Sequence, residues 1–414
     1  MRSTRRNLVW LGVLLLLMSL LLVACGDGGG AAQATQAATV PAEAATEEAP
    51  AVVNTEEPAD TTAETPTETP PDATAEAPAE TGGAMTTDRA VTVPFLNEWM
   101  NSPHNDVASE AFNHWNEEDP AEVPTDCAKC HSTPGYIDFV GADGSTVNMV
   151  DVPAPLGTTV ECEACHNSAT IVKTSVIFPS GIEIGNLGDE SRCMECHQGR
   201  ASTVSVDQRI ADAGLTEDLD TVSEDMGFTN IHYYAAAATQ YGTLAKGGYE
   251  YAGLAYDARF DHVPSHNTCI ECHNPHTLEV NLEQCQACHT DVESLEDLVD
   301  IRMNGSLVDY DGDGDMEEGV YYEIEGLREK LYTAMQAYSL ETTGTMIAYN
   351  EAAYPYFFTD ANADGTLTDD EAEPFAAWTG RLAKAAYNFQ VSKKDPGRYA
   401  HGGKYIIQLL YDAT

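Results

Sequence analysis

The pentapeptide Cys-x-x-Cys-His occurs five times in this chain and constrains its fold more than any other feature. Of the 11 cysteines in 414 residues, all except Cys25 belong to these five copies. The cysteine pairs are Cys127 and Cys130, Cys162 and Cys165, Cys193 and Cys196, Cys269 and Cys272, and Cys285 and Cys288. One spacing repeated five times is not accidental, so a single chemistry must account for all of these cysteines.

This spacing is typical of covalent haem attachment. Two thiols three residues apart can add to the two vinyl groups on one side of a haem, and the next residue then lies under the iron. Disulfides would also use the cysteines, but they do not require a histidine after every second one. Zinc could use one such motif, but five uniform copies behind an export signal argue against it. We therefore expect five covalently bound haem c groups, with thioether bonds to the ten motif cysteines and proximal iron ligands at His131, His166, His197, His273 and His289.

The histidines outside the motifs are candidates for the second axial position of the haem irons. The chain has 12 histidines, so seven remain when the five proximal ones are set aside. Five irons with two histidine ligands each need five of these. His276 lies three residues after His273 and is expected to reach a neighbouring haem, and His401 begins a predicted last helix. The candidates, with the preferred ones first, are His276, His401, His104, His232, His262, His114 and His266.

The N-terminus has the features of a bacterial export signal with a lipid-attachment cysteine. Three arginines precede an apolar run over residues 8–24, which ends at Ala24-Cys25-Gly26. A small residue before the cysteine and a leucine three residues before it resemble the lipobox of bacterial lipoproteins. A plain signal peptide or a short transmembrane anchor is the alternative. We expect residues 1–24 to be a signal peptide and Cys25 to carry the lipid that anchors the chain to a bacterial membrane, in the periplasm or at the cell surface.

Charge and composition restrict the partners. Residues 25–90 are rich in Ala, Thr, Glu and Pro and nearly free of large apolar residues, which predicts a disordered acidic tether. The whole chain has 20 basic and 67 acidic side chains, a net charge of −47, which excludes nucleic acid as a partner. The same negative charge favours redox partner proteins with a basic surface. We expect a quinol-linked donor in the membrane and an external acceptor, and assembly into oligomers or filaments is compatible with this picture.

Two acidic loops near the C-terminus match calcium-binding sequences. Residues 360–371 place oxygen-bearing side chains, a glycine and a final glutamate at the positions of an EF-hand loop, with a merely acidic turn as the alternative. The expected Ca²⁺ ligands are Asp360, Asn362, Asp364, Thr366 and Glu371. A second loop, over residues 309–320, is less regular, and its candidate ligands are Asp309, Asp311, Asp313, Asp315 and Glu318.

The expected fold is mainly α with extensive loops around a chain of haems, with minimal sheet and longer helices after residue 320. We expect a five-haem domain over residues 91–300 and a helical part over residues 301–414 that packs on it. A helix over residues 322–340 is predicted from the apolar stripe Leu327, Leu331, Met335 and Tyr338. Another is predicted directly after the calcium loop, from the spacing of Phe375, Trp378, Leu382 and Ala386.

From about residue 95 onward the chain resembles multihaem cytochromes c, in particular the superfamily of cytochrome c nitrite reductase and hydroxylamine oxidoreductase. The resemblance rests on the five motifs, the Cys-His-Asn-Pro-His element that ends at His276, and a helical C-terminal part with a late histidine. Typical nitrite reductases carry a lysine as proximal ligand at the catalytic haem, whereas all five motifs here end in histidine. The resemblance therefore implies haem architecture and electron transfer more than catalysis.

Two functions are compatible with these features. The first is an extracytoplasmic electron carrier whose irons each bind two histidines. The second is a reductase or oxidase of a small nitrogen or sulfur compound, which needs one haem with an open axial position. Because nothing in the sequence identifies such a haem, we prefer the electron carrier and assign no catalytic residue.

Overall fold

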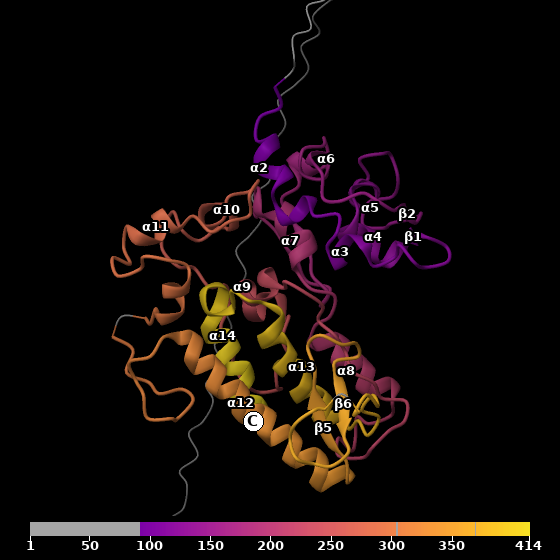
Figure 1. The fold of residues 1–414 in the computed structure, drawn as a ribbon, viewed down its shortest axis with the longest axis vertical. Coiled ribbons are helices and arrows are strands. Elements are labelled where there is room, and N and C mark those ends of the chain that lie inside the picture. The colour runs from indigo at the N-terminus through magenta and orange to yellow at the C-terminus, as the bar shows by residue number, and fades with distance from the viewer. Residues whose placement is uncertain (1–91, 304, 369) are drawn as a thin grey trace, which may run out of the picture. The chain divides into compact units, whose positions relative to one another are not determined.

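The computed structural model describes residues 92–303, 305–368 and 370–414 (Figure 1). The predicted signal peptide, Cys25 and the predicted tether lie outside these ranges. The described residues belong to one compact unit, Asp88–Thr414. Among them, no helix is both long enough and apolar enough to cross a bilayer.

Short helices joined by loops form the chain up to residue 300. None of the helices described in this part exceeds 10 residues. The α-helices are α2 (Leu96–Met100), α3 (Glu110–Asn113), α4 (Thr125–His131), α5 (Thr133–Phe139), α6 (Cys162–Cys165), α7 (Glu190–His197), α8 (Thr203–Asp212), α9 (Ala236–Ala245), α10 (Cys269–Cys272) and α11 (Leu282–Gln286). The 3-10 helices are η1 (Pro103–Asn105), η2 (Thr170–Val172) and η3 (Glu296–Asp300).

Sheet is limited, within the described residues, to three small antiparallel pairs. They are β1 (Glu122–Val123) with β2 (Ala154–Pro155), β3 (Val176–Ile177) with β4 (Glu183–Ile184), and β5 (Met346–Tyr349) with β6 (Phe357–Asp360). The first two pairs have two residues per strand and act only as local ties between loops. The prediction of a mainly α fold with minimal sheet is confirmed.

Three longer helices form the C-terminal part, as predicted, and lie side by side in Figure 1: α12 (Val320–Thr343), α13 (Gly380–Lys394) and α14 (Arg398–Ala413). Helix α12 is a few residues longer at each end than the predicted span. Gly344 is its C-cap and has a left-handed φ of 76°, which glycine adopts without strain. Leu327, Leu331 and Met335 from the predicted stripe are buried in the main core. Helix α9 also packs on α14, which joins the motif-bearing part to the C-terminal helices.

The helix predicted directly after residue 371 is wrong in its first half. Helix α13 begins only at Gly380, capped by the Thr379 side chain, which accepts a hydrogen bond from the backbone N–H of Leu382 at 3.2 Å. The segment before it bonds to β6 instead, because the N–H of Phe375 donates to the carbonyl of Phe357 at 3.0 Å. Phe375 and Trp378 are nevertheless buried, so their apolar spacing marks the core rather than a helix.

Truncating Leu331 in the middle of α12 should destabilise the protein strongly. Leu331 is 0% exposed, and Leu331→Ala should lower the free energy of unfolding by about 2–5 kcal/mol, since it removes buried methylene groups and leaves a cavity. Leu340→Ala on the same helix is the matched control, because Leu340 is 40% exposed and its truncation should cost no more than about 0.5 kcal/mol. Denaturant unfolding of both haem-loaded variants measures the difference, and equal losses would contradict the burial argument.

Candidate functional site

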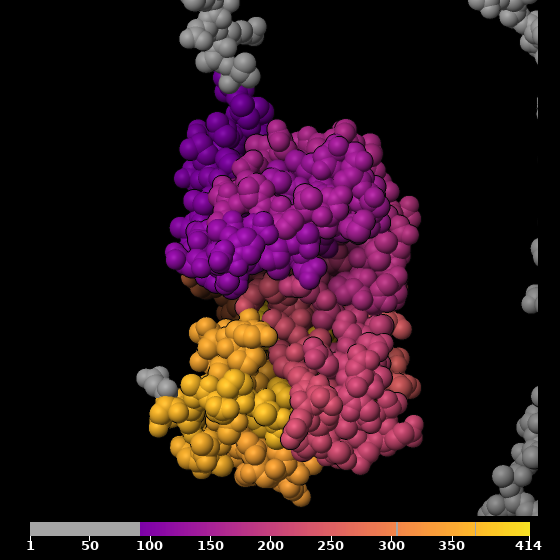
Figure 2. All heavy atoms as spheres, turned by 90° about the vertical axis from the view of Figure 1, so that its right-hand side faces the viewer, coloured from indigo at the N-terminus to yellow at the C-terminus, as the bar shows by residue number. Residues whose placement is uncertain are grey.

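A single large cavity brings together all the residues that the motif argument singles out. It has a volume of about 3500 Å³, and its lining includes the ten motif cysteines and all twelve histidines. Ordinary ligand pockets measure ~300–1,000 Å³, so this cavity has room for several large ligands. Figure 2 shows the surface hollowed between the N-terminal segments in indigo and the C-terminal segments in yellow. The ten cysteines are free thiols, so the structure does not use them as disulfides.

Each motif lies on a short helix or at its end. Helices α4, α6, α7 and α10 contain both cysteines of the first four motifs, and α11 contains Cys285 of the fifth. Residues i and i+3 of a helix share one face, so the two cysteines of a motif point to the same side. The following histidine lies at or just after the end of the helical turn, where its ring can turn into the cavity. The local sequence thus presents two thiols and an imidazole to one place in each motif.

Every motif histidine faces a second histidine from a distant part of the chain. The ring centroids of the five pairs are 5.8–6.4 Å apart. The pairs are His131 with His232 (5.8 Å), His166 with His276 (6.3 Å), His197 with His104 (6.4 Å), His273 with His401 (6.3 Å) and His289 with His262 (6.0 Å). His276 faces the second motif and not its own, as expected from its place next to His273.

Two of the seven candidate histidines are not part of such a pair within the described residues. His114 is exposed, and its Nδ1 lies 2.7 Å from a carboxylate oxygen of Glu110 one turn earlier on the helix. The backbone N–H of His266 donates to the carbonyl of Val263 at 3.0 Å in a tight turn. These two histidines rank low in the sequence argument, together with His262.

Backbone carbonyls orient three of the motif histidines. The Nδ1 atom of His131 lies 2.8 Å from the carbonyl oxygen of Ala111, and that of His197 lies 3.0 Å from the carbonyl oxygen of Tyr234. The Nδ1 of His273 has a similar partner in Leu278 at 3.3 Å. Such a bond fixes the ring plane and places the proton on Nδ1, which leaves Nε2 free to bind a metal.

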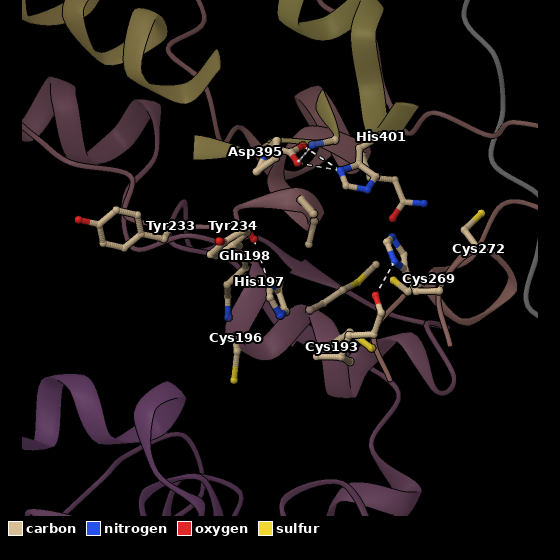
Figure 3. A pocket seen from close by; sticks show the side chains of 18 of the residues that line it. Cys193, Cys196, His197, Gln198, Tyr233, Tyr234, Cys269, Cys272, Asp395 and His401 are labelled. Atoms are coloured by element: carbon tan, nitrogen blue, oxygen red, sulfur yellow. Dashed lines mark hydrogen bonds and ion pairs between the residues drawn. The ribbon is translucent and has the colours of Figure 1, made fainter. Parts of the chain in front are cut away.

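His401 differs from these because its partner is a carboxylate. Its Nδ1 lies 2.9 and 3.0 Å from the two oxygens of Asp395, which caps the C-terminal end of α13 and is 1% exposed (Figure 3). Burial disfavours the charged ring, but the Asp395 carboxylate outweighs this and raises the pKa of His401. A Cβ atom at Gly397 would collide with the His401 ring, so glycine is required there. Sequence reasoning missed Asp395, although it stands only six residues before His401.

Two other histidines of the cavity are neutral near pH 7. Burial, helped by the charge of His197, lowers the pKa of His104 to about 4. Burial also lowers the pKa of His232 to about 4, with smaller contributions from His131 and Arg200. A neutral imidazole is the form that binds metals, so both rings are ready to act as ligands at physiological pH.

The third motif is in contact with the first and the fourth. Lys129 in the first motif forms an ion pair of 3.3 Å with Glu195 in the third, and the thiol of Cys196 donates to the carbonyl of Lys129 at 3.9 Å. Between the third and fourth motifs, the backbone N–H and the thiol of Cys269 donate to Oε1 of Glu190, the first residue of α7, at 3.3 and 3.6 Å. Lys129 is therefore a structural link between two motifs, a role that its place inside the first motif does not reveal.

The second and fifth motifs contact the third and fourth motifs, respectively. Ala164 of the second motif packs in the same small apolar cluster as Cys196 of the third. Asn281 links the last two motifs, because its N–H donates to the carbonyl of Cys272 at 2.8 Å and its own carbonyl lies 3.9 Å from the sulfur of Cys285. Cys162 in the second motif and Cys288 in the fifth are the exposed cysteines among the ten. The motifs thus form a branched series in which the third contacts the first, second and fourth, and the fourth contacts the fifth.

The less regular acidic loop clusters its carboxylates more tightly than expected. One oxygen each of Asp309, Asp311 and Glu323 lie within 4.8 Å of one another, and the same holds for Asp311, Asp313 and Glu318. Glu323, from α12, is fully buried and paired with Arg302 at 2.6 Å. Burial and then the nearby carboxylates raise the pKa of Glu318 to about 7. Sequence reasoning missed Glu323 because it lies beyond the loop, and calcium at this loop, with Asp315 among its ligands, stays a prediction.

Comparison with known proteins finds similarity to cytochromes c, in agreement with the haem-attachment motifs. Residues 110–198 match the family described as cytochrome c7 and related cytochrome c. Two relatives are the C-type polyheme cytochrome OmcB of Geobacter sulfurreducens, 24% identical over 382 residues that cover 80% of this chain and 48% of the relative, and OmcC of the same species, 23% identical over 390 residues that cover 77% and 46%. No solved structure matches the chain.

This chain is therefore similar to multihaem c-type cytochromes over most of its length. It spans about half the length of the curated relatives it matches. The resemblance to the nitrite reductase and hydroxylamine oxidoreductase superfamily stays an expectation from the sequence.

Proposed function

We propose that this protein is an exported, lipid-anchored c-type cytochrome with five haems that transfers electrons through irons bound by two histidines each. The observation that carries the proposal is that each motif histidine faces a second histidine at 5.8–6.4 Å. Metal–imidazole bonds of about 2 Å on opposite sides of one ion would place two ring centroids roughly 6 Å apart. The residues present therefore fit five haem irons with two axial histidines.

Cysteines and histidines of the chain would hold the haems in different ways. The motif cysteines would attach each haem covalently, and one histidine from the motif and one from elsewhere would bind its iron. Bound haem supplies a one-electron couple between ferric and ferrous iron. The carbonyls of Ala111, Tyr234 and Leu278 hold the motif rings in a fixed orientation, which keeps the ligand set unchanged between oxidation states.

The contacts between motifs support a route for electrons. The third motif contacts three others, so it would act as the junction of the series. The first, second and fifth motifs are the ends of this series. We infer that partner proteins exchange electrons at such end motifs. The acidic composition, with a net charge of −47, favours partners with a basic contact surface.

The comparisons support electron transfer by several haems, and the N-terminal sequence supports a location outside the cytoplasm. The relatives are named as polyheme cytochromes, which agrees with electron transfer through several haems. The apolar run that ends at Cys25 supports export and lipid anchoring outside the cytoplasm. A quinol-linked membrane donor and an external acceptor remain the expected partners.

A reductase or oxidase would need a motif histidine with no opposed ligand. Within the described residues, all five motif histidines have an opposed ring, and the two histidines left over do not lie opposite a motif histidine. No other observation favours an open iron. We therefore prefer the electron carrier to an enzyme that acts on a small nitrogen or sulfur compound.

Low-temperature electron paramagnetic resonance of the oxidised, haem-loaded protein tests this proposal. Two histidines on each iron should give only low-spin ferric signals, and nitrite or hydroxylamine should leave them unchanged. A high-spin signal that integrates to about one haem in five and shifts on addition of either compound would overturn the proposal in favour of the enzyme.

A further inference from the structure

The loop that follows β6 contains a buried carboxylate oxygen with no hydrogen-bond partner. Asp360, the last residue of β6, is 2% exposed. Its Oδ2 accepts a hydrogen bond from the backbone N–H of Gly365 at 2.7 Å, whereas its Oδ1 has no partner among the described residues. A buried carboxylate needs hydrogen bonds or a cation, because an unpaired charge away from water is costly.

No basic side chain in the described residues forms an ion pair with this loop. The ion pairs of Lys, Arg and His do not include Asp360, Asp364 or Glu371. Glu371 is also buried, at 8% exposure, and its Oε1 accepts a hydrogen bond from the N–H of Ala361 at 2.9 Å. From the neighbouring helix α12, the neutral amide of Gln336 donates to the carbonyl of Gly365 at 3.2 Å, and the neutral phenol of Tyr332 also lies near Asp360. Two buried carboxylates therefore face one loop without a counter-charge.

We propose that residues 360–371 bind one calcium ion through the free Oδ1 of Asp360 and the other oxygens of the loop. The further ligands would be the side chains of Asn362, Asp364 and Glu371 and the carbonyl of Thr366, a set of oxygens that suits Ca²⁺. Gly365 has a φ of 86°, which allows the sharp turn required at the middle of such a loop. Strand β6 leads into the loop and an extended segment leaves it, so the site differs from a helix–loop–helix hand.

The position of the loop gives the ion a structural role. The segment after it returns along β6, because the N–H of Thr359 donates to the carbonyl of Glu373 at 2.9 Å. The chain then continues into α13, which ends at Asp395, the partner of the haem-ligand candidate His401. Calcium would tie β6 to the start of this path and so stabilise the C-terminal helices. This inference is independent of the proposed electron transfer.

Calcium titration of the haem-loaded full chain, after removal of divalent ions with a chelator, tests the site. Isothermal titration calorimetry should show a calcium ion bound with a Kd on the order of 10⁻⁴–10⁻³ M or tighter, as in extracellular calcium modules. Asp360→Asn should weaken this binding at least about tenfold, because it removes the charge of the carboxylate whose Oδ1 has no other partner. Calcium should also raise the Tm of the unsubstituted protein by at least ~2 °C.

Glu373→Gln is the matched control. It removes the same charge from an exposed residue close to the loop and should change the affinity by less than about twofold. If Asp360→Asn does not give the native haem spectrum, Glu371→Gln takes its place. The proposal is overturned if the unsubstituted protein shows neither calcium heat nor a rise in Tm. It is also overturned if Asp360→Asn and Glu371→Gln bind calcium as well as Glu373→Gln, which would place the ion elsewhere.

Discussion

Replacing Asp395 with asparagine should raise the reduction potential of one haem most, the one that His273 and His401 would ligate. The Asp395 carboxylate lies 2.9 and 3.0 Å from Nδ1 of His401 and is 1% exposed, so its negative charge acts with little screening. A carboxylate partner makes the imidazole a stronger electron donor and favours ferric iron. The amide of asparagine keeps the shape but loses the charge, so the ferrous state becomes easier to reach.

The expected rise is on the order of 100 mV. A hydrogen bond to a charged group is worth ~1.5–3 kcal/mol, and a tenfold change in equilibrium constant, ~1.4 kcal/mol, is 59 mV for a one-electron couple. His131, His197 and His273 have backbone carbonyls as their Nδ1 partners, and the Asp395 charge acts on His197 and His273 without a direct hydrogen bond. A spectroelectrochemical titration should therefore show the largest rise in the couple of His273 and His401, a smaller rise in the couple of His197, and little change in the others.

The control for this prediction is Asp257→Asn. Asp257 pairs at 2.7 Å with Lys404, which lies on the same helix α14 as His401, so the variant removes an equal charge without touching a histidine. It should leave the five potentials almost unchanged, because that ion pair is exposed to solvent on the lysine side. Equal shifts in both variants would mean that Asp395 acts only through the net charge of the protein and not through His401.

Replacing His104 with alanine should open one iron and leave the others closed. The ring of His104 faces His197 at 6.4 Å, and no other histidine of the described residues pairs with that motif. We expect a new high-spin ferric signal that integrates to about one haem in five, with a change on addition of cyanide or nitrite that the unsubstituted protein does not show.

His114→Ala is the matched control, since it removes a histidine ten residues further along the same segment. The His114 side chain is 55% exposed and pairs with Glu110 rather than with a motif histidine. The spectrum of this variant should match that of the unsubstituted protein. If both variants gave the same high-spin fraction, the assignment of His104 as an axial ligand would be wrong.

The two acidic loops show which calcium-ligand candidates a sequence pattern can predict and which it cannot. The regular spacing of residues 360–371 makes this loop the better calcium candidate in the sequence, and the unpartnered Oδ1 of Asp360 supports the same choice. The other loop gains Glu323 from α12, which no loop pattern includes. Spacing describes only ligands that are close in the chain, so a ligand from another element becomes visible only when the chain has folded.

The sequence by itself determined the features that depend on neighbours along the chain. Each Cys-x-x-Cys-His motif is complete within five residues, so the haem-attachment prediction needs no knowledge of the fold. The buried stripe of α12 follows in the same way from helical periodicity, because residues three and four apart share one face. The periodicity failed at Phe375 and Trp378, where backbone bonds to β6 replaced the helix that the apolar spacing suggested.

Only the tertiary structure decided which histidine faces which motif and which motifs are neighbours. His232 stands 101 residues after His131, and His401 stands 128 residues after His273, so no local pattern can connect them. The sequence only ranks the seven candidate histidines, and the folded chain decides that the ring of His104 lies opposite a motif histidine and that of His114 does not. Such pairs depend on long-range packing around one shared cavity, and that packing is a property of the whole chain rather than of any segment.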